Sequence, residues 1–227
     1  MKLNKVVKRE PLRQQVLASL KNALINGDLT PGQRLTEEGV AEFLGVSRTP
    51  AREALAILHQ AGSIKRRENG GFEVIAPTME DIEQIFQVRH RLEPYAARLA
   101  AEKVTSGDIR QLQKYLAEQE AHVNAVSATR YLEADRALRG LLFSLSGNQQ
   151  LVDCIGRYEE HLQFVAALTL KDPAIRRIAM NVDRPLVEAI SKRDPEAAEA
   201  AAHTQLEEAR KALMQVLGDA IESGLYG

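Results

Sequence analysis

The sequence predicts a mainly α-helical protein in two parts: a small N-terminal domain with three helices and a β-hairpin, and a larger all-helical domain. Three observations predict this class. The 227 residues include no tryptophan and few aromatic residues but much alanine, leucine and glutamate, a composition that favours helices. Apolar residues recur at helical spacing through most of the chain, and an extended pattern occurs only within residues 64–75. Pro77 disfavours helix at the residue before it, which separates a domain of residues 1–76 from one of residues 77–227.

Three helices are expected in the first domain. Apolar positions at helical spacing predict a helix over residues 12–26, and a second, shorter helix is predicted over residues 36–44. Only Gly45–Ser47 separates the second helix from a third, which runs out at Ala61-Gly62. A short turn that contains glycine is what a helix-turn-helix motif requires.

Two arginines lie on one face of the third predicted helix. Arg48 and Arg52 are four residues apart, and Pro50 fits the first turn, with Ser47 or Thr49 as the cap. The opposite face is apolar and is formed by Ala51, Ala54, Leu55 and Leu58. A helix that presents two arginines and a threonine at its N-terminal end has the layout of a recognition helix in a DNA major groove. A solvated arginine face is the alternative for this segment taken alone.

A basic hairpin is expected directly after the third helix. Two short segments, residues 64–67 and 72–75, are joined by Glu68-Asn69-Gly70-Gly71, and Asn-Gly and Gly-Gly between extended segments are hairpin signals. The hairpin therefore predicts a wing. Residues 1–76 contain 12 Lys and Arg against 8 Asp and Glu, whereas the rest of the chain contains 18 against 23. This asymmetry favours a polyanion-binding first domain.

The residues of the first domain resemble a known family. The run from Leu44 to Leu55, Leu-Gly-Val-Ser-Arg-Thr-Pro-Ala-Arg-Glu-Ala-Leu, follows Pro31-Gly32, Leu35, Glu37 and Val40-Ala41. Together they closely resemble the winged-helix domain of GntR-type bacterial transcriptional regulators.

This resemblance implies binding to double-stranded operator DNA. The residues expected to contact the operator are Ser47, Arg48, Thr49 and Arg52, with Gly70 and Gly71 at the wing tip in the minor groove, and with Arg66 and Arg67 at phosphates or only in solvent. A homodimer is expected, because two half-sites related by twofold symmetry multiply the specificity of a single DNA-binding domain.

Helices are predicted throughout the second domain. Their expected ranges are 79–103, 107–126, 129–146, 149–170, 173–192 and 195–220. Thr78 with Asp81 forms a capping-box pattern, Ser106 marks a second start, and Asp172-Pro173 and Asp194-Pro195 each place an Asp cap before a proline at the first helical position.

Several of these helices carry polar side chains on their apolar stripes. The five positions are Arg89, Asp135, Arg139, Asp183 and Gln205. Charges on buried stripes are costly unless they are paired or face a wet cavity, so the pattern predicts one internal polar pocket. The alternative is a set of purely structural salt bridges, Arg89 with Glu93 and Asp135 with Arg139, in a DNA-binding protein without an effector.

A second resemblance covers residues 79–213. Arg89-His90-Arg91-Leu92-Glu93, Asp135, Ser146-Gly147-Asn148 and Ala189-Ile190 look like parts of the FCD effector domain of the FadR subfamily. Many FCD domains bind a divalent metal through one Asp and three His, and the metal orients a small carboxylate effector.

The metal positions of that domain differ in this chain. By the resemblance, the Asp is Asp135, but the His positions hold Arg139, Asp183 and Gln205. Arginine cannot ligate a metal, because its guanidinium stays protonated. We therefore expect no metal and no other cofactor. Arg139 would supply the positive charge instead, and Arg89 would receive a small acidic effector, so the resemblance implies a ligand-controlled regulator, with repressor the expected sign.

Other classes of protein find no support in the sequence. A glycine-rich phosphate loop, a nucleophile elbow and a Ser/His or Cys/His pair in a known context are all missing, which argues against an enzyme. No apolar run approaches the roughly 18 residues of a membrane span. The single Cys154 excludes an internal disulfide framework and fits the cytoplasm, and we expect it to be packed as a small apolar side chain.

Overall fold

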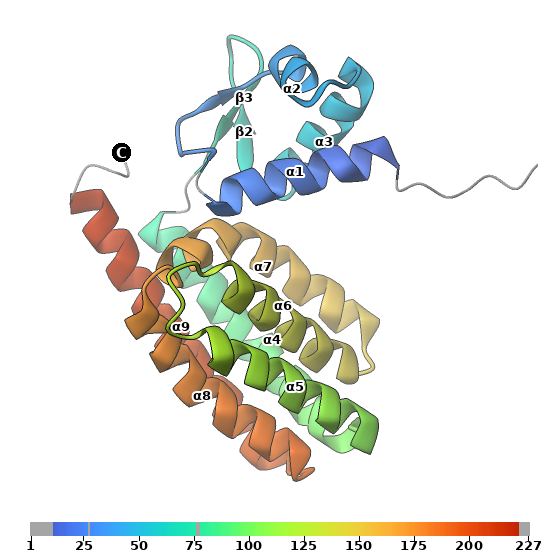
Figure 1. Cartoon of the computed structure of the whole chain (residues 1–227), viewed down its shortest axis with the longest axis vertical. Helices are drawn as coiled ribbons and strands as arrows, with labels where there is room; N and C mark the ends of the chain where they lie inside the picture. The colour runs from blue at the N-terminus through green and yellow to red at the C-terminus, as the bar shows by residue number, and fades with distance from the viewer. Residues whose placement is uncertain (1–10, 27, 76–77, 223–227) are drawn as a thin grey trace, which may run out of the picture. The chain divides into compact units, whose positions relative to one another are not determined.

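The computed structural model describes residues 11–26, 28–75 and 78–222. The chain divides into two compact units, residues 1–76 and 77–227. The elements of the first unit, drawn in blue to green in Figure 1, are α1 (Leu12–Asn26), β1 (Arg34–Leu35), α2 (Glu37–Leu44), α3 (Arg48–Gln60), β2 (Ile64–Arg66) and β3 (Phe72–Val74). The three helices and the hairpin are those expected from the sequence.

The hairpin belongs to a sheet of three antiparallel strands with the order β1-β3-β2. Arg34 lies opposite Glu73, and Ile64 lies opposite Val74. Strand β1 was not predicted, because two residues are too short to display an alternating pattern. Its pairing ties strand β3 of the wing to the segment that precedes α2.

The core of the first unit lies beneath α3. Ala51, Ala54, Leu55 and Leu58 are completely buried on the face opposite the arginines. The side chain of Thr36 caps α2 by accepting a hydrogen bond from the Gly39 amide at 3.0 Å. Ser47 occupies the N-cap position of α3 but makes no side-chain capping bond, and Thr49 lies within the helix. Of the two predicted caps, Ser47 is therefore the N-cap residue, although without a side-chain bond, and Thr49 is not the cap.

The second unit consists of helices among its described residues. They are α4 (Met79–Lys103), α5 (Ser106–His122), α6 (Thr129–Leu145), α7 (Gln149–Thr169), α8 (Pro173–Ser191) and α9 (Pro195–Glu222). Helix α4 packs against α6, α7, α8 and α9, and α5 lies beside α6 (Figure 1). No helix in the described part of the chain combines the length and the apolar character that a membrane span needs.

Most helix starts agree with the sequence signals. Thr78 and Asp81 form the predicted capping box, and the Asp172 side chain accepts from the Ala174 amide at 2.7 Å. The cap of α5 is Thr105 rather than Ser106, because Thr105 forms its own capping box with Asp108. Cys154 is exposed, so its predicted packing is wrong.

Helix α5 ends after His122, four residues earlier than predicted. The backbone beyond it is held by Arg176 of α8, a completely buried side chain. Its guanidinium donates to the carbonyl of Val123 at 2.7 Å and to that of Ala125 at 2.5 Å. The chain therefore leaves the helix to supply carbonyls to an arginine far away in the sequence.

Candidate functional site

The exposed face of α3 carries three of the predicted DNA contacts. Arg48, Thr49 and Arg52 are all exposed. Arg48 forms an ion pair with Glu38 of α2, and both side chains remain largely in solvent. Within the described residues, Arg52 makes no ion pair. Both arginines are thus available to a ligand outside the protein, since exposed ion pairs are weak.

The wing tip depends on two glycines with positive φ. Gly70 and Gly71 both have φ of +80°, and a Cβ on Gly71 would lie 2.7 Å from the Leu35 carbonyl oxygen. Arg34 of β1 donates to the carbonyl of Gly70 at 3.4 Å and supports the turn. Gly70 is exposed, whereas Gly71 lies against β1. Gly70 is therefore better placed than Gly71 for close approach to DNA.

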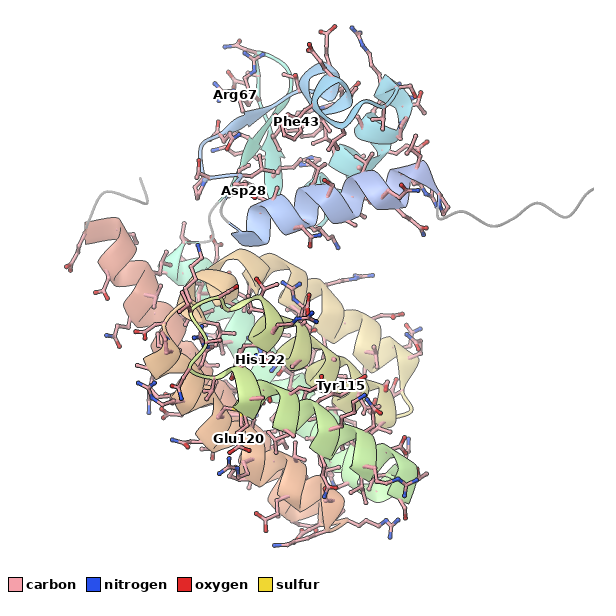
Figure 2. All side chains as sticks on the ribbon, in the orientation of Figure 1. Asp28, Phe43, Arg67, Tyr115, Glu120 and His122 are labelled. Carbon is pink, nitrogen blue, oxygen red and sulfur yellow. The ribbon has the colours of Figure 1, made fainter. Side chains whose placement is uncertain are left out.

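The two wing arginines have partners within the wing. Arg67, labelled in Figure 2, donates to Glu73 at 2.7 Å, and the same carboxylate lies 3.1 Å from Lys65. The guanidinium of Arg66 lies over the Phe72 ring, 6.0 Å from its centroid. Arg66 is exposed and Arg67 is half-buried, so Arg66 is the more accessible of the two predicted phosphate contacts.

The second unit contains a cavity of about 340 Å³. All five predicted effector residues line it: Arg89, Asp135, Arg139, Asp183 and Gln205. They come from α4, α6, α8 and α9. The apolar part of its wall includes Leu132, Leu162, Ile175, Ile178, Ala209 and Leu213. The structure thus brings together, around one space, residues that lie more than a hundred positions apart.

The two arginines at the polar end of the cavity, Arg89 and Arg139, already share one buried counter-ion, Glu93. Arg89 donates to the two carboxylate oxygens of Glu93 at 2.5 and 3.3 Å. Arg139 donates to Glu93 at 3.1 Å and to Glu159 of α7 at 2.8 Å. The predicted ion pair of Arg89 with Glu93 is present. The predicted pair of Asp135 with Arg139 is wrong, because Arg139 is turned to the two glutamates.

The two aspartates are bridged by an amide. Gln119 of α5 donates through Nε2 to Asp135 at 3.1 Å and to Asp183 at 3.2 Å. Gln205 donates to the other oxygen of Asp183 at 2.5 Å. Gln119 is completely buried, and among the residues that the structure describes its Oε1 atom has no hydrogen-bond partner. The aspartates are thus close together and are held by neutral groups.

Their surroundings move the pKa values of these acids in opposite directions. Burial, together with the neighbouring Asp183, raises the pKa of Asp135 to about 7, and burial also raises the pKa of Asp183. Burial acts in the same direction on Glu93, but Arg89 and Arg139 outweigh it and hold the pKa of Glu93 below its usual value. Glu93 is therefore a charged carboxylate, whereas the aspartate pair tends to hold a proton.

The residues at the family's metal positions do not fit a zinc ion. The amide group of Gln119 donates between the two carboxylates, and Arg139 brings a cation rather than a lone pair. Among the described residues, no group of three or more His, Cys, Asp and Glu side chains is arranged to hold a metal. The expectation of a metal-free protein stays a prediction.

Gln119 and Glu159 were not recognised from the sequence as parts of the site. The role of Glu93 as a counter-ion shared by Arg89 and Arg139 was not recognised either. Gln119 lies on the apolar stripe of α5 with Leu112 and Leu116, and Glu159 lies between Ile155 and Leu162 on α7. Polar residues on apolar stripes are the signal that finds them. Their partners come from other helices and are not evident from spacing.

Two family models match the chain. The model of the bacterial regulatory proteins of the gntR family matches residues 12–74, and the FCD domain matches residues 84–208. The HTH-type transcriptional regulator YdhC of Bacillus subtilis is 28% identical over 195 residues, which are 86% of this chain and 87% of YdhC. The HTH-type transcriptional repressor RspR of Escherichia coli is 25% identical over 207 residues, 91% of each chain.

Solved structures resemble the whole fold. E. coli McbR/YncC has a TM-score of 0.81 at 25% identity, covering 92% of this chain and 99% of that one. A GntR regulator from Rhodococcus has a TM-score of 0.74 at 25% identity, covering 91% and 97%. These relatives are named as transcriptional regulators, not as enzymes. This chain belongs to the GntR family of bacterial transcriptional regulators and is a member with a C-terminal FCD domain, as the FadR subfamily has.

Proposed function

We propose that this regulator is a homodimeric repressor that acts on operator DNA in the cytoplasm and is controlled by a small metabolite bound in the cavity of its FCD domain. Residues 1–76 serve as the DNA-binding domain. Residues 77–227 serve as the effector and dimerisation domain. The similarity to a protein named as a repressor, RspR, supports the sign of regulation.

The observation that carries the effector role is the cavity of about 340 Å³ with its polar end. Small-molecule sites are concave and mostly apolar, with a few polar groups that fix orientation, and this cavity has those properties. A purely structural network would need no such space beside it. The alternative of an effector-independent protein therefore explains the buried ion pairs but not the cavity.

The exposed side chains of α3 support the DNA role. Arg48 and Arg52 project from a helix whose other face is completely buried, so the helix is rigidly held while its arginines remain accessible. Arginine reads guanine with two hydrogen bonds in the major groove. We assign base contacts to Arg48, Thr49 and Arg52, with Ser47 beside them, and wing contacts to Gly70, Gly71, Arg66 and Arg67.

The DNA role is tested with an operator selected from random duplexes by the full-length protein. We expect a footprint with two half-sites related by twofold symmetry, as a homodimer requires. Arg52→Ala should weaken operator binding by roughly 1 to 3 kcal/mol while changing nonspecific binding much less. Arg130→Ala, an exposed arginine on α6, is the matched control and should leave both unchanged. An equal loss of specific and nonspecific affinity would reduce Arg52 to a phosphate contact.

The effector role is tested by screening metabolites for a rise in melting temperature, because a ligand that binds the folded state stabilises it. Hits are then added to the operator complex, and we expect release of the DNA. A hit that strengthens operator binding instead would overturn the repressor assignment. The acidic effector expected from the sequence stays a prediction, and the pairing of both arginines with glutamates does not favour it.

A further inference from the structure

With Asp135 and Asp183 both ionised, the charges at the polar end of the cavity do not balance. Asp135 and Asp183 face it, and Glu93 and Glu159 are the partners of its arginines, which gives four carboxylates. Two buried or half-buried arginines oppose them. Arg136 also lines the cavity but is exposed, and a lining glutamate of α9, Glu208, has its own partner in Lys211 at 2.8 Å. The cavity therefore presents more negative than positive charge.

The aspartate pair is the part of the site that lacks a positively charged partner. Within the described residues, neither Asp135 nor Asp183 forms an ion pair, and their hydrogen bonds come from the amides of Gln119 and Gln205. An amide supplies hydrogen bonds but no charge. Asp135 accepts only one of these bonds, although a carboxylate can accept about four. Acceptor capacity and an uncompensated negative charge therefore coincide on the wall of the cavity.

The arginines, by contrast, offer an anionic ligand little positive charge, because glutamates already pair with them. Glu93 contacts both Arg89 and Arg139 and is only 2% exposed. A carboxylate or phosphate that bound either arginine through its Nε and Nη2 groups would compete with a glutamate for them, and Glu93 lies inside a site from which it cannot reach water. Stranding a buried charge in this way is costly. Both arginines are thus paired with carboxylates of the protein itself, whereas within the described residues neither aspartate has a charged partner.

We propose that the effector is a small organic amine, whose ammonium group contacts Asp135 and Asp183 from the cavity and whose apolar body packs against the leucines and isoleucines of the cavity wall. This inference rests on the proposed effector role of the cavity. The ammonium group donates to both carboxylates and reduces the excess of negative charge at the site. The raised pKa values of the two aspartates agree with a pair that lacks a cation.

Three series of probes that differ only in their head group test the proposal. Linear amines, alcohols and carboxylates from butyl to octyl are titrated into the full-length protein at pH 8, with calorimetry and melting temperature as readouts. We expect each amine to bind about tenfold or more tightly than the alcohol of the same length, with the carboxylate weakest. Magnesium chloride alone serves as the inorganic cation probe and should not stabilise the protein.

Conservative variants test whether Asp135 and Asp183 cause the preference for amines over alcohols. Asp135→Asn should lose about tenfold of its affinity for the amine while its affinity for the alcohol stays within about twofold. Asp183→Asn should behave in the same way. Glu133→Gln, an exposed acid on the same helix as Asp135, is the matched control and should retain the amine preference.

Several outcomes would overturn the inference: tighter binding of the carboxylates, stabilisation by magnesium alone, no binding by any amine, or an amine preference that survives in Asp135→Asn and Asp183→Asn. Operator binding separates these failures from a failure of the proposed function. A carboxylate that binds and releases the operator would refute the amine but leave the ligand-controlled regulator intact. A protein that binds no selected operator would refute the regulator itself.

Discussion

The arginines of the two units have opposite surroundings. In the DNA-binding unit Arg52 is exposed and unpaired within the described residues, and the partner of Arg48 is equally exposed. In the FCD unit Arg89 and Arg139 share the buried Glu93, and Arg176 is enclosed by backbone carbonyls. The same residue type is therefore accessible to an external ligand in one unit and holds the fold together in the other. The counter-ion that the fold supplies decides which.

Energetics make this difference consequential. An exposed pair such as that of Arg48 with Glu38 is worth about 0 to 1 kcal/mol, so a DNA phosphate or base can replace the glutamate at little cost. Removing one partner of a buried pair costs about 3 to 5 kcal/mol, since the other charge is left without compensation. Substitutions in the FCD unit should thus act on stability, and substitutions on α3 should act on DNA affinity.

The largest effect is expected for Arg176→Ala. The guanidinium also donates to the carbonyls of Leu170 at 2.9 Å and Lys171 at 3.2 Å, in addition to those beyond α5. Its removal leaves these carbonyls unsatisfied and opens a cavity, so we expect the FCD unit to lose about 4 kcal/mol of unfolding free energy in urea. Arg177→Ala, the exposed neighbour, should cost less than about 0.5 kcal/mol. Equal effects of the two would mean that Arg176 is no structural clamp.

Glu93→Gln should have the next largest effect, a loss of about 3 kcal/mol of unfolding free energy, because Arg89 and Arg139 then share a neutral partner. The lowered pKa of Glu93 fixes the pH dependence. Its stabilisation is complete above its ordinary pKa of 4.5 and is lost as the pH falls through the lowered value. The difference between wild type and variant should therefore shrink in acid. Glu102→Gln, exposed on the same helix, should show neither effect.

Local signals predicted most of the fold. Thr78 with Asp81, and Asp172 followed by Pro173, mark two helix starts. In the structure Thr78 and Asp81 form a capping box, and the Asp172 side chain accepts from the Ala174 amide. The end of α5 was placed too late because Arg176, which holds the chain beyond it, lies some fifty residues away. Sequence spacing contains no record of such a contact.

The candidate site, like the fold, could be predicted from the sequence only in part. That Arg89 and Arg139 lie inward is evident from their helical stripes, and so is the pairing of Arg89 with Glu93 four residues on. The choice of Arg139 between Asp135 and the glutamates was not evident, because Glu93 and Glu159 reach it from α4 and α7. Periodicity gives the side of a helix on which a residue lies, and the packing of different helices decides its partner.

Asp135→Asn should stabilise the protein, in contrast to the loss expected at Glu93. The folded state raises the pKa of Asp135 from 3.8 to about 7, so it binds more protons than the unfolded state between these values. Stability therefore declines as the pH rises through that window. Removing the titrating group should leave the variant about 2 kcal/mol more stable than wild type at pH 8 and close to wild type near pH 4. A variant that is less stable at every pH would contradict the raised pKa.

The smallest effect concerns the wing, where a pair of alanine substitutions separates the support of the fold from contact with DNA. Gly71→Ala places a Cβ 2.7 Å from the Leu35 carbonyl oxygen at a φ of +80°, whereas Gly70→Ala has the same φ but open space around it. We expect Gly71→Ala to destabilise the DNA-binding unit by about 1 kcal/mol more than Gly70→Ala, measured by urea denaturation. If the exposed Gly70 approaches the minor groove, its substitution weakens operator binding beyond the loss that its effect on stability explains. Operator binding that follows stability alone in both variants would remove the wing tip from the DNA contacts and leave recognition to α3.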